Sequence, residues 1–572
     1  MHGNERVAAV FDQLADLLEI EDANPFRVRA YRNAARTVRA LGRELSELRA
    51  EGRDLTTLPG IGKDLAEKIV EILDTGTTEA LEELHRRVPA GLEDLLQVPG
   101  LGPKRVRALH AALAIDNLAG LREAAQAGRL RELGGFGAKT EQTILEAIAA
   151  RRTEERRHLL VDAERQAEPL AAHLRDLAGV KQVVVAGSYR RGRETVGDLD
   201  VLVTARRGSA VMERFVGYPR VERVVSKGPT RSTVLLAGGL QVDLRLLPER
   251  AFGAALHYFT GSKAHNIQIR RLAQRQQLKI NEYGVFRGDD RLTGKTEKSV
   301  FKAVGLPWIA PELREDGGEI DAAREGRLPR LVERRQLRGD LHVHSRNGDG
   351  RNTPAELASA ARDAGLRYLA MTDRPPRTAG GIDTRRLRRQ WGRIDVLNEE
   401  LEGVTLLKGV EVEILRDGGL DLPDGLLADA DLVVGVVCED FGLNRARQTE
   451  RILRAMDNPW FTVLAHPTGR LLLECDPYDM DVARVVRHAA ERGCFLELNS
   501  QPRRLDLADV YCRMARDEGV LLVIDSDARE VNEIDYLRYG VQQARRGWLE
   551  AAHVANTRPL TALRKLIAAM RP

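Results

Sequence analysis

The sequence predicts a multidomain chain of mixed class, with a helical N-terminal region, an α+β middle and an α/β barrel at the C-terminus. Three observations lead to this prediction. Apolar residues recur at helical spacing around a repeated Gly-x-Gly motif in residues 1–150, strands that carry aspartates occupy residues 180–250, and short apolar strands alternate with helical stretches from Gly339 onward. The length of 572 residues is sufficient for about four domains of ordinary size.

Composition excludes a membrane protein and a disulfide-stabilised secreted protein. No apolar run approaches the ~20 residues that a membrane-spanning helix needs. The N-terminus is charged from residue 5 and lacks the apolar core of a signal peptide. The four cysteines all lie in the last quarter of the chain without CxxC spacing, which favours reduced thiols. We expect a cytoplasmic monomer that does not contact membranes.

Charge is distributed unevenly along the chain. The formal net charge is +4, but residues 181–310 carry 23 Lys and Arg against 11 Asp and Glu, whereas residues 341–572 carry 33 against 36. A basic block around a group of carboxylates is typical of a protein that holds a polyanion while a metal site works on it.

Residues 5–20 and 26–41 are predicted to form helices, and the second is rich in arginine with Tyr31 among the basic residues. A basic helix is more often a solvated surface, but next to the repeat that follows it favours a DNA contact. The helix predicted at 63–73 carries Lys68 one step outside its apolar stripe.

A short motif recurs three times in this region. LPGIGK at 58–63 returns as VPGLGPK at 98–104 and, more loosely, as LGGFGAK at 133–139. Glycines without Cβ let a phosphate approach the backbone N–H groups at a helix start, and such contacts position a strand without reading its bases. The copies resemble helix-hairpin-helix motifs, with tight turns between packed helices as the alternative. The candidate DNA contacts are Gly60, Gly62, Gly100, Gly102, Gly135, Gly137, Lys104 and Tyr31.

The middle of the chain carries three strand-borne aspartates. A buried strand is predicted at 183–185, followed by a Gly187-Ser188 turn and a loop with arginines at 190, 191 and 193. Asp198 and Asp200 open the next strand and share one face, while Asp243 lies on another alternating strand. Clustered carboxylates need a cation, and hard oxygen ligands favour Mg²⁺ or Mn²⁺. The pattern predicts a two-metal phosphoryl-transfer site.

The string AGSYRRGRETVGDLD at 186–200, with VDLR at 242–245, resembles the palm of the family X DNA polymerases, the relatives of polymerase beta. The resemblance implies metal-binding carboxylates at Asp198, Asp200 and Asp243, with Asp243 also accepting the primer hydroxyl proton. Gln241 departs from the family, because polymerase beta has an arginine there. The implied triphosphate contacts are Gly187, Ser188 and Arg191.

Two further stretches resemble the same family. YFTGS at 258–262, with an asparagine four residues later, resembles the nucleotide-binding corner, and NEYGVF at 281–286 resembles a thumb motif. The implied dNTP contacts are Tyr258, Phe259, Gly261, Asn266 and Arg270. GIGKDLAEK at 60–68 resembles the polymerase beta lyase domain, which implies a Schiff-base lysine at Lys68 and 5′-deoxyribose-phosphate lyase activity. A solvated lysine is the alternative.

The C-terminal half is predicted to form a parallel barrel with its functional residues at the carboxyl ends of the strands. The predicted strands are 369–371, 405–407, 432–437, 462–465, 495–498 and 520–524. The candidate metal ligands are His342, His344, Asp349, Asp373, Glu411, His466 and Asp527.

GDLHVHS at 339–345, LAHPTGR at 464–470 and DSDA at 525–528 resemble the polymerase-and-histidinol-phosphatase (PHP) domain, a distorted (β/α)7-type barrel. The pairing of the two halves resembles bacterial family X polymerases. The departures are Arg374, Cys438 and Arg529, which stand where family members carry histidine. Arginine stays protonated and repels a cation, and cysteine shifts the preference towards softer metals.

These departures affect the family's three metal positions differently. One position would use His342, His344, Glu411 and Asp527, a second would keep Glu411 and His466, and a third would keep Asp349 beside two arginines. We expect at most one well-formed position, with Zn²⁺ or Mn²⁺ at reduced occupancy. The PHP domain is therefore predicted to be weakly active or inactive as a 3′–5′ exonuclease. A residual Mn²⁺-dependent nuclease is the alternative.

The resemblance implies a repair polymerase that fills short gaps, as in base excision repair, with gapped or primer–template DNA and dNTPs as partners and two Mg²⁺ or Mn²⁺ ions. A non-catalytic DNA-binding repair scaffold and a phosphoesterase with DNA-binding appendages are the alternatives. The expected divisions are a lyase-like helix-hairpin-helix domain at 1–85, a helix-hairpin-helix subdomain at 86–160, a nucleotidyltransferase palm at 161–255, a nucleotide-selecting thumb at 256–315, a charged linker at 316–338 and the PHP domain at 339–572.

Overall fold

The computed structural model divides into two compact units, Met1–Arg156 and Arg157–Pro572, and each is described by itself. Within the described part of the chain, no helix combines the length and apolar character needed to cross a membrane. The structure describes residues 3–21, 23–41, 43–88, 91–96, 98, 101–134, 136–137, 140–141, 144–145, 157–206, 210–374 and 383–571.

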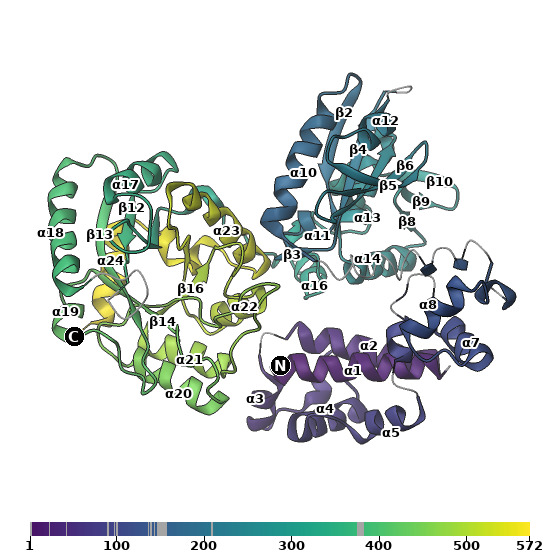
Figure 1. Ribbon diagram of the computed structural model, residues 1–572, viewed down its shortest axis with the longest axis horizontal. Helices are drawn as coiled ribbons and strands as arrows, with labels where there is room; N and C mark the ends of the chain where they lie inside the picture. Colours follow the sequence, from purple (N-terminus) through teal and green to yellow (C-terminus); the bar gives the residue numbers. More distant parts are fainter. Residues whose placement is uncertain are drawn as a thin grey trace. The chain divides into compact units, whose positions relative to one another are not determined.

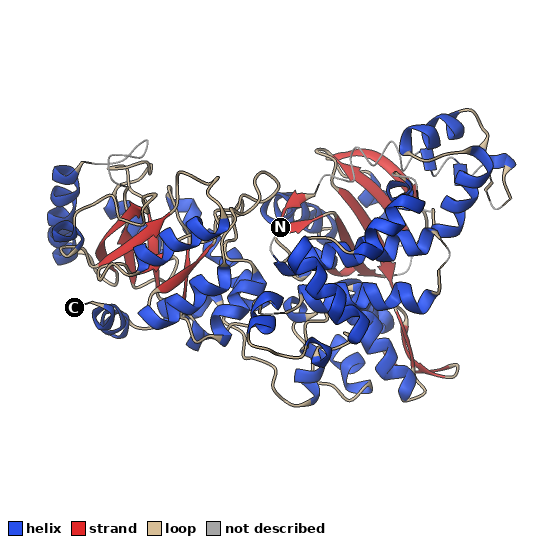
Figure 2. Cartoon of the chain, turned by 90° about the horizontal axis from the view of Figure 1, so that it is seen from below, coloured by secondary structure: helices blue, strands red, loops and turns tan. Residues whose placement is uncertain are grey.

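The described elements of the first unit are helical, as the periodicity predicts (Figures 1 and 2). They are α1 (Gly3–Ile20), α2 (Pro25–Arg39), α3 (Leu45–Ala50), η1 (Leu55–Thr57), α4 (Lys63–Thr75), α5 (Glu79–Arg87), α6 (Leu92–Leu96), α7 (Pro103–Leu113), α8 (Leu118–Gln126) and η2 (Leu130–Glu132).

Helix α2 packs against α1, and its basic face is partly neutralised there. Arg32 forms ion pairs with Asp16 and Glu19 of α1, and Arg39 lies 2.6 Å from Asp12. These two arginines are therefore paired within the fold, with 38% of each side chain exposed.

A five-stranded sheet in the order β2-β4-β7-β6-β5 forms the first part of the second unit. At its centre β4 and β7 are parallel, whereas the other neighbouring strands are antiparallel. The elements are β1 (His158–Leu159), α10 (Leu160–Arg175), β2 (Val180–Val185), α11 (Gly187–Arg190), β3 (Thr195–Val196), β4 (Asp198–Ala205), α12 (Val211–Val216), β5 (Val221–Lys227), β6 (Arg231–Leu236) and β7 (Gln241–Leu247).

A helical group with a small antiparallel sheet, β10-β9-β8, follows the five-stranded sheet. Its elements are η3 (Glu249–Ala251), α13 (Phe252–Thr260), α14 (Lys263–Arg275), β8 (Lys279–Asn281), β9 (Gly284–Arg287), β10 (Asp290–Thr293), α15 (Glu297–Ala303), η4 (Pro311–Leu313), α16 (Glu319–Arg324) and η5 (Arg334–Gln336).

The charged composition of 316–338 predicts a linker, but the structure has ordered, packed elements there. Glu319 of α16 is fully buried and lies 2.6 Å from Nδ1 of His265. Just before this segment, buried Arg314 donates to Glu297 at 2.7 Å. Charged residues are buried here because each has a partner of complementary chemistry.

The C-terminal part is a seven-stranded parallel sheet in the order β11 to β17, with helices around the strands (Figure 1). A parallel bridge between Val343 and Ala528 joins the first strand to the segment after the last, so the barrel is nearly closed. This confirms the predicted PHP-type barrel architecture.

The barrel elements are β11 (Gly339–Val343), α17 (Pro354–Asp363), β12 (Tyr368–Met371), α18 (Thr384–Glu400), β13 (Thr405–Glu413), α19 (Asp424–Leu427), β14 (Leu432–Val436), α20 (Arg445–Met456), β15 (Val463–Leu464), α21 (Val482–Arg492), β16 (Phe495–Asn499), α22 (Asp509–Asp517), β17 (Leu522–Asp525), η6 (Val531–Tyr536), α23 (Leu537–Arg546), η7 (Ala551–His553), η8 (Ala555–Thr557) and α24 (Leu560–Met570).

Candidate functional site

The pairing of β4 with β7 brings the three predicted aspartates together. Asp200 and Asp243 are direct partners on these parallel strands, and Asp198 lies two residues before Asp200 on the same face. Leu199 points the other way and is fully buried in the core. The strand-borne arrangement predicted from the sequence is therefore present.

The carboxylates repel one another. Burial and the charges of Asp198 and Asp243 raise the pKa of Asp200 to about 7, and burial together with Asp243 raises the pKa of Asp198. Because the folded chain holds the Asp200 proton more tightly than the unfolded chain does, the metal-free fold loses stability as the pH rises from about 4 to about 7. The residues thus fit a site for divalent cations.

Asp243 is held by three side chains that the sequence analysis did not assign. The hydroxyl of Thr233 donates to Oδ1 at 2.6 Å, Arg231 donates to the same oxygen at 3.1 Å, and Gln241 donates to Oδ2 at 3.1 Å. Gln241 therefore supports the carboxylate despite its departure from the family, and Arg231 on β6 supplies the positive charge. Arg231 and Thr233 alternate on β6, which pairs with β7. This alternation is the sequence signal that could have identified them as partners of Asp243.

The Gly187-Ser188 turn is the start of a short helix, α11, so the prediction that Arg190 lies in a loop is corrected. Gly187 has φ +64°, and a Cβ at this position would lie 3.0 Å from Oδ2 of Asp200. A side chain would crowd this carboxylate, which explains the glycine. Arg191 caps the helix, with Nε 3.0 Å from Glu315 and NH1 donating to the carbonyl of Thr260 at 2.8 Å.

The predicted nucleotide-binding corner lies at the junction of α13 and α14. The guanidinium of Arg270 lies 5.6 Å from the centre of the Tyr258 ring, and that of Arg245 lies 4.4 Å from the Phe259 ring. Asn266 is buried, and its amide donates to the carbonyl of Tyr258 at 2.6 Å. A Cβ on Gly261 would lie 2.7 Å from Oδ1 of Asn266. In this structure Asn266 thus positions the backbone that carries the two aromatic residues.

The described residues of the three Gly-x-Gly copies make matching backbone hydrogen bonds. The N–H groups of Ile61, Leu101 and Phe136 each donate to the carbonyl three residues earlier, at 2.9–3.1 Å. The carbonyls of Gly62, Gly102 and Gly137 each accept from the residue four positions later. No atom of the described residues lies within 4 Å of a Cβ built on Gly60, Gly62, Gly102 or Gly137, so these turns are open. Gly100, Gly135 and the side chain of Lys104 lie outside the described residues.

The structure describes the surroundings of two predicted functional residues in the first unit, Tyr31 and Lys68. Tyr31 is 2% exposed and its ring lies 5.7 Å from that of Phe11, so the predicted DNA contact by Tyr31 is corrected to a core position. Lys68 lies on α4 with its side chain 16% exposed, and its ammonium pairs with Asp64 one turn earlier.

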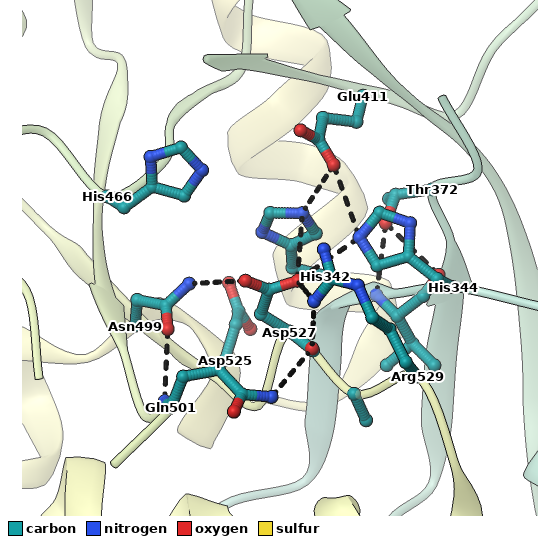
Figure 3. Close-up of polar contacts among 12 residues, drawn as sticks. His342, His344, Thr372, Glu411, His466, Asn499, Gln501, Asp525, Asp527 and Arg529 are labelled. Carbon is teal, nitrogen blue, oxygen red and sulfur yellow. Dashed lines mark hydrogen bonds and ion pairs between the residues drawn. The ribbon is translucent and has the colours of Figure 1, made fainter. Parts of the chain in front are cut away.

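The predicted metal ligands of the barrel lie at the carboxyl ends of the strands (Figure 3). His342, His344 and Asp527 each offer a ligand atom within 4.8 Å of the others. Oε2 of Glu411 lies 3.1 Å from Nε2 of His342 and 3.2 Å from Nε2 of His344. His344, Asp349 and Asp373 form a second group of this kind, although Asp373 accepts from Ser345 at 2.6 Å.

Two guanidinium groups occupy this cluster. Nε of Arg374 donates to Glu411 at 3.0 Å. Arg529 donates to Oδ1 of Asp527 at 2.8 Å and to Asp349 at 3.1 Å. Although burial favours the neutral acids, Arg374 and the two histidines hold the pKa of Glu411 well below its usual value. Arg529 and the histidines do the same to the pKa of Asp527. The carboxylates fit a multinuclear metal site poorly, because the chain's own cations already bind them.

The second predicted metal position is incomplete. His466 is buried, and neither of its imidazole nitrogens has a hydrogen-bond partner among the described residues (Figure 3). Burial and the charge of Arg504 lower its pKa well below the usual value, which keeps the imidazole neutral. Burial and the charge of Glu411 raise the pKa of the Cys438 thiol to about 12. A protonated thiol is a poor metal ligand.

Several buried polar residues behind the ligands were missed by the sequence analysis. Glu497 lies 2.6 Å from Nδ1 of His342 and also accepts from the backbone of His466 and the amide of Asn499. Asp340 accepts from the backbone of Ser526. Asp340 and Glu497 are polar residues within the apolar runs that form β11 and β16. That interruption is the sequence signal that could have identified them.

Comparisons with known proteins match most of the chain. Four family models match: a helix-hairpin-helix domain over residues 2–78, a SAM-like helix-hairpin-helix tandem over 92–150, the DNA polymerase beta palm over 162–237 and the DNA polymerase beta thumb over 255–315.

Three relatives cover different parts of the chain. The DNA polymerase/3′-5′ exonuclease PolX of Bacillus subtilis (strain 168) is 36% identical over 566 residues, or 98% of each chain. A probable phosphatase of Thermoanaerobacter sp. (strain X514) is 32% identical over 202 residues, 33% of this chain and 78% of the phosphatase. DNA polymerase lambda of Rattus norvegicus is 27% identical over 291 residues, 44% of this chain and 46% of the relative.

The raised pKa of Asp200 predicts that metal binding is coupled to proton release. At pH 6.5 the metal-free carboxyl is largely protonated, and a cation displaces that proton. We expect Mn²⁺ binding to release about three-quarters of a proton at pH 6.5 and almost none at pH 8.5. Titration calorimetry in buffers of different ionisation enthalpy measures this number.

The titration is made in the chain with His344→Ala, which weakens metal binding in the barrel. Asp200→Asn on that background is the control and should abolish the coupled release. Equal proton release at both pH values would contradict the prediction.

Proposed function

We propose that this chain, which belongs to the family X DNA polymerases, fills short gaps in DNA during repair. The observation that carries the proposal is the parallel pairing of β4 with β7, which sets Asp198, Asp200 and Asp243 side by side. The basic block at 181–310 around this cluster suits a polyanionic substrate. DNA and dNTPs are the proposed partners.

Each residue of the cluster has a proposed role in nucleotidyl transfer. Asp198, Asp200 and Asp243 would hold two Mg²⁺ or Mn²⁺ ions, which supply charge stabilisation for the attacking and leaving oxygens. Asp243 accepts the primer hydroxyl proton, and its bonds to Thr233, Gln241 and Arg231 fix its orientation. The glycine turn at Gly187 and the guanidinium of Arg191 bind the triphosphate. Tyr258 and Phe259 lie against the sugar, on a backbone that Asn266 holds.

The helix-hairpin-helix turns are proposed to hold the DNA backbone. The open space above Gly60, Gly62 and Gly102 allows a phosphate to approach N–H groups at the starts of α4 and α7, which are helices of 13 and 11 residues. Such contacts are independent of sequence, as gap repair requires.

Substitution of a metal-binding carboxylate should separate catalysis from binding. With Asp198→Ala, we expect primer extension across a one-nucleotide gap to fall at least about 1,000-fold, because the charge that holds the cations is lost. The dissociation constant for gapped DNA should change less than about twofold, since other residues carry the phosphate contacts. Single-turnover extension and fluorescence anisotropy measure the two quantities.

Glu222→Ala is the matched control, because Glu222 is an exposed carboxylate on β5 of the same sheet. It should leave extension unchanged. Extension that survives Asp198→Ala would refute the catalytic assignment, and DNA binding without any extension in the unaltered chain would favour a scaffold.

Lys68 is proposed to act as the nucleophile of a 5′-deoxyribose-phosphate lyase. Only a primary amine forms a Schiff base with the sugar aldehyde, so borohydride should trap the chain covalently on DNA with a 5′-deoxyribose phosphate. We expect trapping to be lost in both Lys68→Ala and Lys68→Arg. Gel analysis of the cross-linked product is the measurement.

Lys63→Ala is the control for this test, since Lys63 lies at the exposed start of the same helix. If Lys68→Arg is trapped as well as the unaltered chain, another amine carries the activity. If neither chain is trapped, the lyase proposal is refuted.

The barrel is proposed to be weak or inactive as a 3′–5′ exonuclease, with at most one cation, Zn²⁺ or Mn²⁺, near His342, His344 and Asp527. Arg374 and Arg529 donate to Glu411 and Asp527, so a metal would have to displace a guanidinium from each carboxylate. The name of the Bacillus subtilis relative, by contrast, gives that protein a 3′-5′ exonuclease activity.

Removal of the two arginines should make the barrel more receptive to metal. In the full chain with Asp198→Ala, and without dNTPs, we expect Mn²⁺-dependent loss of 3′ nucleotides to be near background. The added changes Arg374→His and Arg529→His should raise it at least about tenfold. Gel analysis of an end-labelled strand measures the rate.

His344→Ala tests the source of any activity, because it removes one ligand and should leave contaminating nucleases unaffected. Strong Mn²⁺-dependent degradation by the Asp198→Ala chain that disappears with His344→Ala would contradict the proposal and establish a residual nuclease.

A further inference from the structure

The C-terminal end of the barrel helix α23 lies against the turn that carries the proposed triphosphate contacts. The side chain of Arg546 is 2% exposed, and its NH1 lies 3.0 Å from Oε1 of Glu315 and 3.1 Å from the carbonyl of Arg191. Its NH2 donates to Asp509 at 2.6 Å. One buried guanidinium therefore joins the barrel, the segment after η4 and the phosphate-binding turn.

Glu315 is shared between two arginines. The same oxygen, Oε1, lies 3.0 Å from Nε of Arg191 and 3.0 Å from NH1 of Arg546. The NH1 of Arg191 is held by the carbonyl of Thr260. A carboxylate that divides its charge between two guanidinium groups neutralises each less than it would neutralise one alone.

The same turn is held by the barrel at two further points. A Cβ on Gly192 would lie 2.3 Å from Cγ of Gln542 on α23, so the turn and the helix are in close contact. Glu194 accepts hydrogen bonds from Arg470 at 2.6 Å and from Gln543 at 2.5 Å. Residues 191–194 are therefore fixed by side chains that come from the barrel.

We infer that the barrel has a second role, in which Arg546 is a positioning residue for the nucleotide site. Arg546 fixes the backbone of Arg191 and takes part of the charge of Glu315, which leaves more of the positive charge of Arg191 available to a triphosphate. This inference rests on the proposed function, since it assigns the ligand of Arg191 as a dNTP. It gives the barrel a role that does not depend on metal or on nuclease chemistry.

The inference is tested in the full chain with Arg546→Gln. Without the second guanidinium, Glu315 pairs with Arg191 alone and competes with the triphosphate. We expect the KM for the dNTP in gap filling to rise about tenfold, while kcat and the affinity for gapped DNA change less than about threefold. Titration calorimetry of the metal-loaded chains measures the dissociation constant for the dNTP without turnover, and this constant should rise in Arg546→Gln in the same way.

A rescue variant separates this electrostatic role from a merely structural one. In Arg546→Gln combined with Glu315→Gln, the competing negative charge is removed, and the KM should return to within about threefold of the unaltered value. Arg538→Ala is the matched control, because Arg538 is another arginine of α23 that bonds Glu164 of α10 and lies outside the Arg191 network. Its KM should be unchanged.

Two results would overturn the inference. One is an unchanged KM and dNTP affinity in Arg546→Gln with a melting temperature close to that of the unaltered chain. The other is a raised KM that Glu315→Gln does not rescue, which would assign Arg546 to stability alone. A failure of the proposed function is distinguishable, because the unaltered chain would then neither fill gaps nor bind the dNTP.

Discussion

Clustered carboxylates need compensating positive charge, and this chain meets the requirement in two different ways. In the five-stranded sheet, no side chain of the described residues donates a hydrogen bond to Asp198 or Asp200, and the pKa of Asp200 rises to about 7. In the barrel, Arg374 and Arg529 donate directly to Glu411 and Asp527. Asp243 bonds Arg231, but Asp198 and Asp200 have no such donor in the described part of the chain and fit cations from outside the protein, whereas the barrel carboxylates are largely compensated by the chain itself.

This difference is the physical basis for the proposal that the two sites differ in chemical capacity. A guanidinium neutralises a carboxylate but has no open coordination position for a water or a phosphate oxygen, so it replaces the charge of a metal and not its catalytic properties. The barrel retains buried His342, whose Nδ1 lies 2.6 Å from Glu497, and buried His344, whose Nε2 lies 3.2 Å from Oδ1 of Asp527. Its architecture can thus persist without the multinuclear metal site that the PHP resemblance implies.

Charge balance also connects the sheet region to the barrel helix α23. Glu315 lies between Arg191 of the sheet region and Arg546 of the barrel, and each guanidinium limits how strongly the carboxylate binds the other. A barrel that contributes to this network remains useful to a polymerase whatever its own metal content. That gives a physical reason for its close fit against the turn at 191–194, where Gly192 contacts Gln542.

Local spacing and residue chemistry were enough to predict most of the helices and strands, the three Gly-x-Gly turns, the two aspartate-bearing strands and the arginines that stand in place of barrel histidines. It did not determine that Tyr31 is a core residue, that Arg231 and Thr233 hold Asp243, or that Arg546 reaches Glu315 across 231 residues of chain. Such partners are selected by strand register and side-chain packing between distant segments, so only the tertiary structure decided them.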